Sequence, residues 1–103
     1  MKIEFDPAKS ARNARERSLP FELTAELDWS VARVRPDDRR EYGEKRFVAL
    51  VPKTRRLYVV CYCTRGDVRR IISFRRANKR EERTYEKASD EAGDAGADET
   101  NDE

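Results

Sequence analysis

The longest apolar run in the chain, Leu57–Cys63, is seven residues long and constrains the fold more than any other segment. A membrane-spanning helix needs roughly 20 apolar residues, so the run excludes a membrane span. Valine, cysteine and tyrosine dominate it, and these residue types favour extended backbone. Because both faces of such a strand are apolar, the run predicts a strand over residues 57–64 at the centre of a sheet.

Further strands are predicted on both sides of this run. Residues 65–67 carry a glycine and predict a tight hairpin into a strand over Val68–Phe74. Another strand is expected over Arg46–Val51, with a turn at 52–55. The alternation in Trp29–Val34 fits a fourth strand. Short connections of this kind predict an antiparallel meander.

The N-terminal part of the chain predicts one short strand and two helices. Residues 2–5 alternate and fit a strand. Asp6 and Pro7 then predict a helix start, because Asp is a preferred N-cap and Pro suits the first helical position. Good helix formers continue to Arg17. A second helix over 21–27 would bury its apolar residues against the sheet.

The order of the elements predicts an α+β fold. After Phe74 the pattern becomes helical, with Ala77, Glu81 and Tyr85 on one face. One strand, two helices, a meander of three or four strands and a final helix make up a single domain over residues 1–87. We expect the two N-terminal helices and the C-terminal helix to pack on one face of the sheet and to leave the other face free.

The charge of the chain is divided between this domain and a tail. Residues 1–87 hold all 23 Lys and Arg residues against 14 acids, whereas residues 88–103 hold seven acids and no base. The tail has no large apolar side chain and is expected to be disordered. A cationic domain of this size favours binding of a polyanion or an acidic partner. The alternative is an arginine-rich surface that serves solubility alone.

Two compositional facts narrow the chemistry. The chain has no histidine, so catalytic triads, histidine acid–base pairs and histidine metal sites are excluded. Cys61 and Cys63 point to one face of the predicted strand, too far apart for a comfortable disulfide. We interpret them as buried apolar residues of a cytoplasmic protein with no metal site and no cofactor.

The chain carries a series of short motifs, which in chain order are Phe5-Asp6-Pro7-x-Lys9, Asn13, Phe21 with Ala25, Asp28, Gly43-Glu44-x-Arg46, Leu57-x-Val59-Val60, Thr64-Arg65, Arg70-Ile71-Ile72-Ser73-x-Arg75-x-Ala77, Glu81 and Tyr85. In their order and spacing these motifs resemble the BrnT family, the RelE-like ribonuclease toxins of type II toxin–antitoxin modules. The resemblance covers residues 1–87. Arg17 and Ser18 stand where that family usually carries a histidine and a glycine.

The resemblance implies an endoribonuclease that arrests growth by cleaving RNA. We expect this cleavage to need no metal ion, because the sequence shows no carboxylate cluster suited to magnesium. It also implies a cognate antitoxin of the BrnA type, with which the toxin forms a heterotetramer or another hetero-oligomer. The competing hypothesis is a non-catalytic basic module that binds nucleic acid or an acidic protein. Growth arrest on expression of the chain alone would separate the two.

The candidate site residues follow from the alternation of side chains between the two faces of a strand, together with the resemblance. Tyr58, Val60, Tyr62 and Thr64 share one face of the central strand, which we predict to be the free face. Glu44 is the candidate general base, and Tyr62 could stack on a base or relay a proton. The candidate phosphate ligands in catalysis are Arg46, Arg65 and Arg70, and the candidate RNA-binding residues are Arg75, Arg76, Lys79, Arg80 and Arg83.

Each candidate also has a purely structural interpretation. Glu44 can be a solvated loop acid, and the tyrosines can be half-buried strand residues. Arg70 and Arg75 can form ion pairs with acids of the last helix, Glu81 or Glu82.

Overall fold

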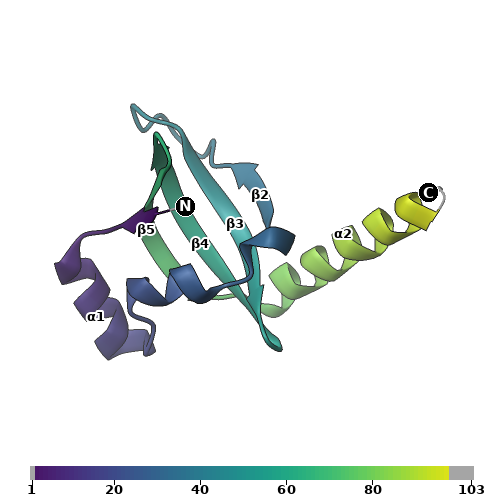
Figure 1. Ribbon diagram of the computed structural model, residues 1–103, viewed down its shortest axis with the longest axis horizontal. Coiled ribbons are helices and arrows are strands. Elements are labelled where there is room, and N and C mark those ends of the chain that lie inside the picture. Colours follow the sequence, from purple (N-terminus) through teal and green to yellow (C-terminus); the bar gives the residue numbers. More distant parts are fainter. Residues whose placement is uncertain (1, 98–103) are drawn as a thin grey trace.

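The computed structural model of the chain describes residues 2–97. The elements, in chain order, are β1 (Lys2–Glu4), α1 (Pro7–Arg17), the 3-10 helices η1 (Phe21–Glu26) and η2 (Trp29–Val31), β2 (Arg33–Pro36), β3 (Arg46–Lys53), β4 (Arg56–Arg65), β5 (Val68–Arg76) and α2 (Lys79–Ala97). The strands form one sheet in the order β1-β5-β4-β3-β2, so the α+β class is confirmed (Figure 1).

The strand expected at the centre of the sheet is there. β4 lies between β3 and β5 and pairs antiparallel with both, which confirms the meander. β2 extends the meander at one edge. At the other edge β1 pairs parallel with β5, with Glu4 opposite Arg70. The segment from β1 to β2 must therefore cross from one edge of the sheet to the other.

The start of α1 follows the sequence signal at Asp6. The Asp6 side chain accepts a hydrogen bond from the Ala8 amide at 2.9 Å, and Pro7 occupies the first turn. The helix ends at Ser18, whose backbone has a φ of 61° and whose amide donates to the Ala14 carbonyl. A left-handed residue at this position is a common helix ending, and glycine is the residue that adopts it without strain.

The Ser18→Gly variant is therefore expected to be more stable than the natural chain, by about 0.5–1 kcal/mol, because a Cβ strains left-handed backbone. Urea unfolding of the two proteins measures the difference. A lower midpoint for Ser18→Gly would contradict this explanation of the helix ending.

Two N-terminal predictions were wrong in detail. Residues 21–26 form a 3-10 helix instead of an α-helix, and residues 29–31 form a second 3-10 turn instead of the start of a strand. Side-chain hydrogen bonds favour the second turn: Asp28 accepts from the Ser30 amide at 3.2 Å, and the Trp29 indole donates to the Thr24 carbonyl at 2.7 Å. Such local bonds compete with strand pairing, so β2 begins only at Arg33.

The prediction of which sheet face is covered was also wrong. The core lies on the face of β4 that carries Val60 and Tyr62, where η1 and η2 cover it. The Tyr62 ring lies edge-on to the Trp29 ring and tilted against Phe47, each at 5.6 Å between centroids. The large tyrosine rings fill the gap between the sheet and the N-terminal turns better than the smaller side chains of the opposite face, such as Cys61 and Cys63, would fill it. The core consists of Leu19, Phe21, Leu27, Ala49, Val51, Val60, Tyr62, Ile71 and Phe74.

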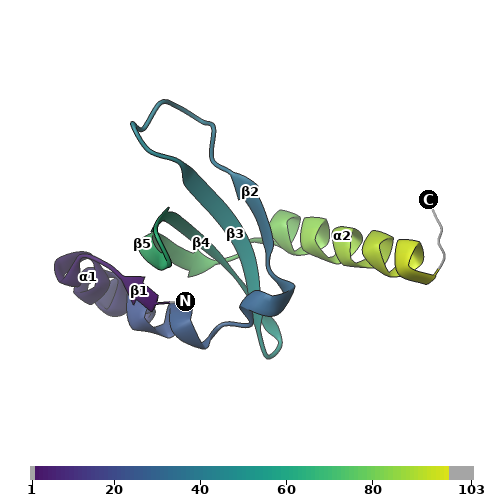
Figure 2. The same cartoon turned by 45° about the horizontal axis from the view of Figure 1, so that its top comes forward.

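The last helix leaves the sheet instead of packing along it. Asn78 and Glu81 exchange side-chain hydrogen bonds with each other's backbone amides, each at 2.8 Å, which starts α2 with a capping box. Tyr85 donates to the Val31 carbonyl at 2.8 Å, and Arg33 of β2 donates to the Ala88 carbonyl at 3.5 Å. Beyond these contacts the helix extends away from the sheet (Figures 1 and 2).

The helix continues through Ala97, where the sequence predicts disorder from residue 88. Once a helix is nucleated, each further residue adds a hydrogen bond, and the alanines of this segment favour that extension. The remainder of the expected tail, residues 98–103, lies outside the described residues. Within residues 2–97 the structure contains no helix long and apolar enough to cross a membrane.

Candidate functional site

The face of the sheet opposite to the core carries a series of arginines. Strand register aligns Arg46 with Cys63, Cys63 with Arg70, and Arg70 with Glu4, and paired residues lie on the same face. The arginines on this face, which we call the arginine face, are Arg33, Arg35, Arg46, Arg65, Arg70 and Arg75. They come from β2, β3, β4 and β5, so the face is cationic across four strands.

The Glu44 carboxylate lies between two of these arginines, where the loop before β3 meets the end of β4. An oxygen of Glu44 is 3.8 Å from Arg46 Nε, and the other is 3.8 Å from a terminal nitrogen of Arg65. The Glu44 side chain is 38% exposed and the Arg65 side chain 58% exposed, so both can reach a ligand from solvent. We call these three residues the Glu44 cluster.

A thiol lies under the Glu44 cluster. Burial raises the pKa of Cys63, and the neighbouring Glu44 carboxylate raises it further. A raised pKa keeps the thiol protonated at neutral pH, and the protonated form is a poor nucleophile. Cys63 is therefore a packing residue here, which agrees with its interpretation from the sequence.

Arg70 is held on the same face by an acid that sequence reasoning missed. Its guanidinium lies 2.7 Å from the Glu4 carboxylate, and the two residues face each other across the β1–β5 pairing. The Arg70 side chain keeps 33% of its surface exposed. The alternation of side chains along β1 places Glu4 on one face of that strand. This would have identified Glu4 as the partner of Arg70 only if the parallel pairing of β1 with β5 had been foreseen.

The loop between β2 and β3 is built around Asp37, whose side chain is only 1% exposed. Its carboxylate accepts two hydrogen bonds from the Arg39 guanidinium, at 2.7 and 2.8 Å, and one from the Tyr42 hydroxyl at 3.3 Å. These donors, Arg39 above all, hold the pKa of Asp37 well below its usual range. The Asp37 amide also donates to the Arg46 carbonyl at 2.8 Å, which joins this loop to the Glu44 cluster.

Tyr62 does not belong to the Glu44 cluster. It lies on the opposite face of the sheet and is 6% exposed, inside the core. Arg69 covers part of it, with the guanidinium carbon 5.1 Å from the Tyr62 ring centroid and 3.6 Å from that of Trp29. The expectation that Tyr62 faces a substrate is therefore wrong.

The predicted RNA-binding residues form a separate group at the far end of β5. Arg75 lies on the arginine face but makes two hydrogen bonds with Glu81, at 2.9 and 2.8 Å, as the structural interpretation expected. This pairing lowers the pKa of Glu81 and raises that of Arg75. Arg75 is five positions after Arg70 along β5, which corresponds to about 16 Å at the usual rise of a strand. The exposed cations of this group are Arg76, Lys79, Arg80 and Arg83.

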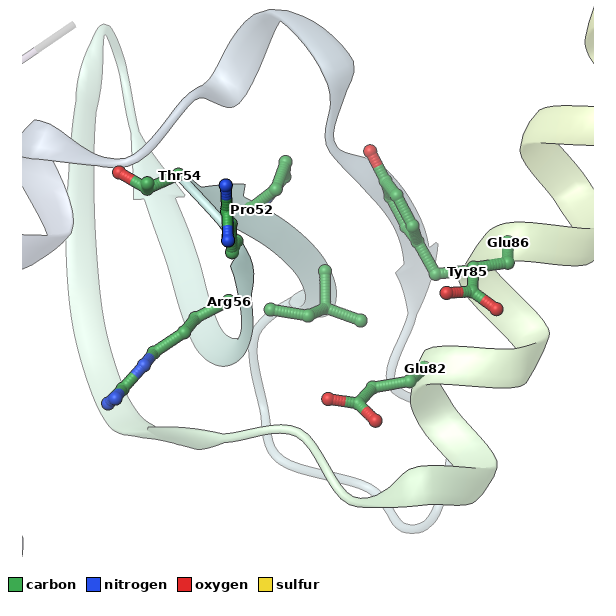
Figure 3. Close-up of a pocket in the computed structure, with 8 residues that line it drawn as sticks. Pro52, Thr54, Arg56, Glu82, Tyr85 and Glu86 are labelled. Carbon is green, nitrogen blue, oxygen red and sulfur yellow. The ribbon is translucent and has the colours of Figure 1, made fainter.

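A pocket of about 210 Å³ lies between the β3–β4 turn and α2, near this second group. Figure 3 shows Glu82 directed toward it and Arg56 pointing away. Its charged lining is balanced, with Arg55 and Arg56 against Glu82 and Glu86. The pocket therefore lacks the excess of positive charge that suits a phosphate, and the Glu44 cluster remains the better candidate site.

The described residues contain no group of three or more His, Cys, Asp or Glu side chains that could hold a metal ion. Charge stabilisation on the arginine face can come from the guanidinium groups themselves. What the Glu44 cluster can do chemically is accept a proton on a carboxylate while two adjacent cations hold an anion.

Comparison with known proteins identifies a family for the chain. The family model described as "Ribonuclease toxin, BrnT, of type II toxin-antitoxin system" matches residues 5–81. Comparisons with curated proteins and with solved structures found no match. The matched segment begins directly after β1, ends in α2, and contains the Glu44 cluster and Arg70. The chain therefore belongs to the BrnT family, the ribonuclease toxins of type II toxin–antitoxin systems.

Proposed function

We propose that the chain is an endoribonuclease that cleaves RNA at the Glu44 cluster without a metal ion, and that a BrnA-like antitoxin neutralises it in a hetero-oligomer. The observation that carries this proposal is the position of the Glu44 carboxylate between two guanidinium groups on a cationic sheet face. The antitoxin follows from the family, whose members act in two-component modules. A RelE-like relationship of the fold stays a prediction.

Cleavage through the 2′-hydroxyl of the RNA fits these groups. Glu44 accepts the proton of the 2′-hydroxyl, and the resulting oxygen attacks the adjacent phosphorus atom. Arg46 and Arg65 stabilise the negative charge that develops on the phosphorane. The bond from phosphorus to the 5′-oxygen breaks, and solvent water protonates that oxygen because the cluster is open. The products are a 2′,3′-cyclic phosphate and a 5′-hydroxyl.

The remaining arginines on this face fit the phosphates on either side of the cleaved bond. Arg70 continues the row of the Glu44 cluster across the sheet. Arg33 and Arg35 lie at the β2 edge of the same face. Each Lys or Arg contact to a phosphate releases counterions, so RNA affinity should fall steeply as salt concentration rises.

The proposal is tested by incubating the purified chain with RNA in the presence and absence of EDTA. We expect equal cleavage in both, with cyclic phosphate ends, because arginines supply the positive charge that a metal ion would otherwise supply. Expression of the chain alone should also arrest growth, and co-expression of its antitoxin should relieve the arrest. RNA binding without cleavage under every condition would favour the alternative, a non-catalytic basic module.

A further inference from the structure

A pocket of about 280 Å³ lies directly beside the Glu44 cluster, in the loop between β2 and β3. Its volume is just below the range of about 300–1,000 Å³ that is typical of small-molecule sites. Glu44 and Arg46 line it and also belong to the cluster. A group bound in this pocket would therefore lie next to the phosphate under attack.

The pocket differs from the arginine face in its charge. Four carboxylates and three cations line the pocket. One of these carboxylates, Asp37, is neutralised by its ion pair with Arg39, which is not part of the lining, so the charges balance. The six arginines of the arginine face outnumber the three carboxylates that pair with them, Glu4, Glu44 and Glu81, and this excess of positive charge suits a phosphate. A balanced pocket suits an uncharged polar group. The charged residues of the lining are Asp37, Asp38, Glu41, Glu44, Arg40, Lys45 and Arg46.

Tyr42 provides an aromatic surface in this pocket. The guanidinium carbon of Arg46 lies 4.1 Å from the centroid of its ring, and that of the exposed Arg40 lies 5.3 Å away. The bond from the Tyr42 hydroxyl to Asp37 holds the ring in the loop. Nucleobases stack on aromatic rings and on guanidinium planes, so this group can extend over a base.

The uncharged group that fits best is a base of the RNA itself. We infer that the pocket binds the nucleobase next to the cleaved bond and that guanine is the preferred base; the inference rests on the proposed function. Asp38 and Glu41 line the pocket with exposed carboxylates, which accept hydrogen bonds but cannot donate them. Guanine presents two adjacent N–H donors, which match one carboxylate. Uracil presents one N–H between two carbonyl oxygens, which a carboxylate repels.

Mononucleotide binding tests the pocket separately from cleavage. The full chain is titrated with guanosine 3′-monophosphate and with uridine 3′-monophosphate, followed by calorimetry or NMR. We expect the guanine nucleotide to bind more tightly. The variant Tyr42→Leu removes the ring on which the base stacks, so it should weaken binding of the guanine nucleotide by about 5- to 150-fold. The matched control Tyr85→Leu makes the same substitution on α2, away from this pocket, and should bind the nucleotide like the natural chain.

A second variant keeps the test valid if Tyr42→Leu fails to fold. The double variant Asp38→Asn, Glu41→Gln changes only exposed side chains, and it should abolish the preference for guanine over uracil. Equal affinity for the two nucleotides in the natural chain, or unchanged binding by a folded Tyr42→Leu, would overturn the inference.

The two proposals fail in different ways. A chain that cleaves RNA but binds neither mononucleotide retains the proposed function and loses the base pocket. A chain that binds the guanine nucleotide through Tyr42 but cleaves no RNA retains the pocket and loses the proposed function.

Discussion

The Glu44→Gln variant should cleave RNA about 10²- to 10⁴-fold more slowly than the natural chain, because an amide cannot accept the proton of the 2′-hydroxyl. Glutamine keeps the size of the side chain, so Arg46 and Arg65 lose a charge partner without a cavity forming. The ion pairs are long, at 3.8 Å, and partly exposed, so stability should change by about 1 kcal/mol or less. Single-turnover cleavage of a labelled RNA, together with a melting curve, measures both quantities.

Glu86→Gln is the matched control for that experiment. Glu86 is exposed on α2, beyond the second group of cations, and its replacement removes the same charge from a position away from the Glu44 cluster. Its cleavage rate should equal that of the natural chain. If Glu44→Gln also cleaves at the natural rate, Glu44 is not the general base.

Replacing Tyr62 by alanine is expected to destabilise the fold by about 3–5 kcal/mol, the range for removing a large buried aromatic side chain. Tyr62 contacts the rings of both Trp29 and Phe47, so the loss leaves a cavity in the middle of the core. A loss of this size is a large part of the total stability of a small domain. Urea unfolding of the variant and of the natural chain gives the difference.

The Tyr62→Phe variant separates packing from chemistry. It keeps the ring and removes only the hydroxyl, and it should cleave RNA at the natural rate because Tyr62 faces the core. Cys61→Ala, on the opposite face of the same strand, should destabilise the fold less than Tyr62→Ala, because Cys61 is smaller and only half-buried. If Tyr62→Phe folds but no longer cleaves RNA, the Tyr62 hydroxyl takes part in cleavage and the assignment of Tyr62 to the core alone is wrong.

The strands and hairpins could be predicted from the sequence because their signals are local. The apolar run at 57–64, the turn at Gly66 and the cap at Asp6 each act within a few residues. The covered face could not be predicted, since both faces of β4 are apolar and alternation does not distinguish them. The choice depends on Phe21 and Leu27, which reach the sheet from a distant part of the chain.

The candidate site shows the same division. Glu44, Arg46 and Arg65 come together through a neighbouring strand pair, which the sequence pattern indicates. Glu4 is brought in by parallel pairing with the strand farthest from it along the chain, and no local signal announces such pairing. The loop that places Tyr42 depends on the hydrogen bonds of buried Asp37, which composition does not reveal.

The parallel pairing of β1 with β5 also sets the order in which the protein can fold as it is made. Glu4 and Arg70 are 66 residues apart in the chain. At about 5–20 residues per second, synthesis of the intervening segment takes roughly 3–13 s, during which β1 has no strand to pair with. The edge of the sheet beside Arg70 therefore closes last. The arginine face of this toxin is therefore complete only after β5 has emerged from the ribosome that makes it.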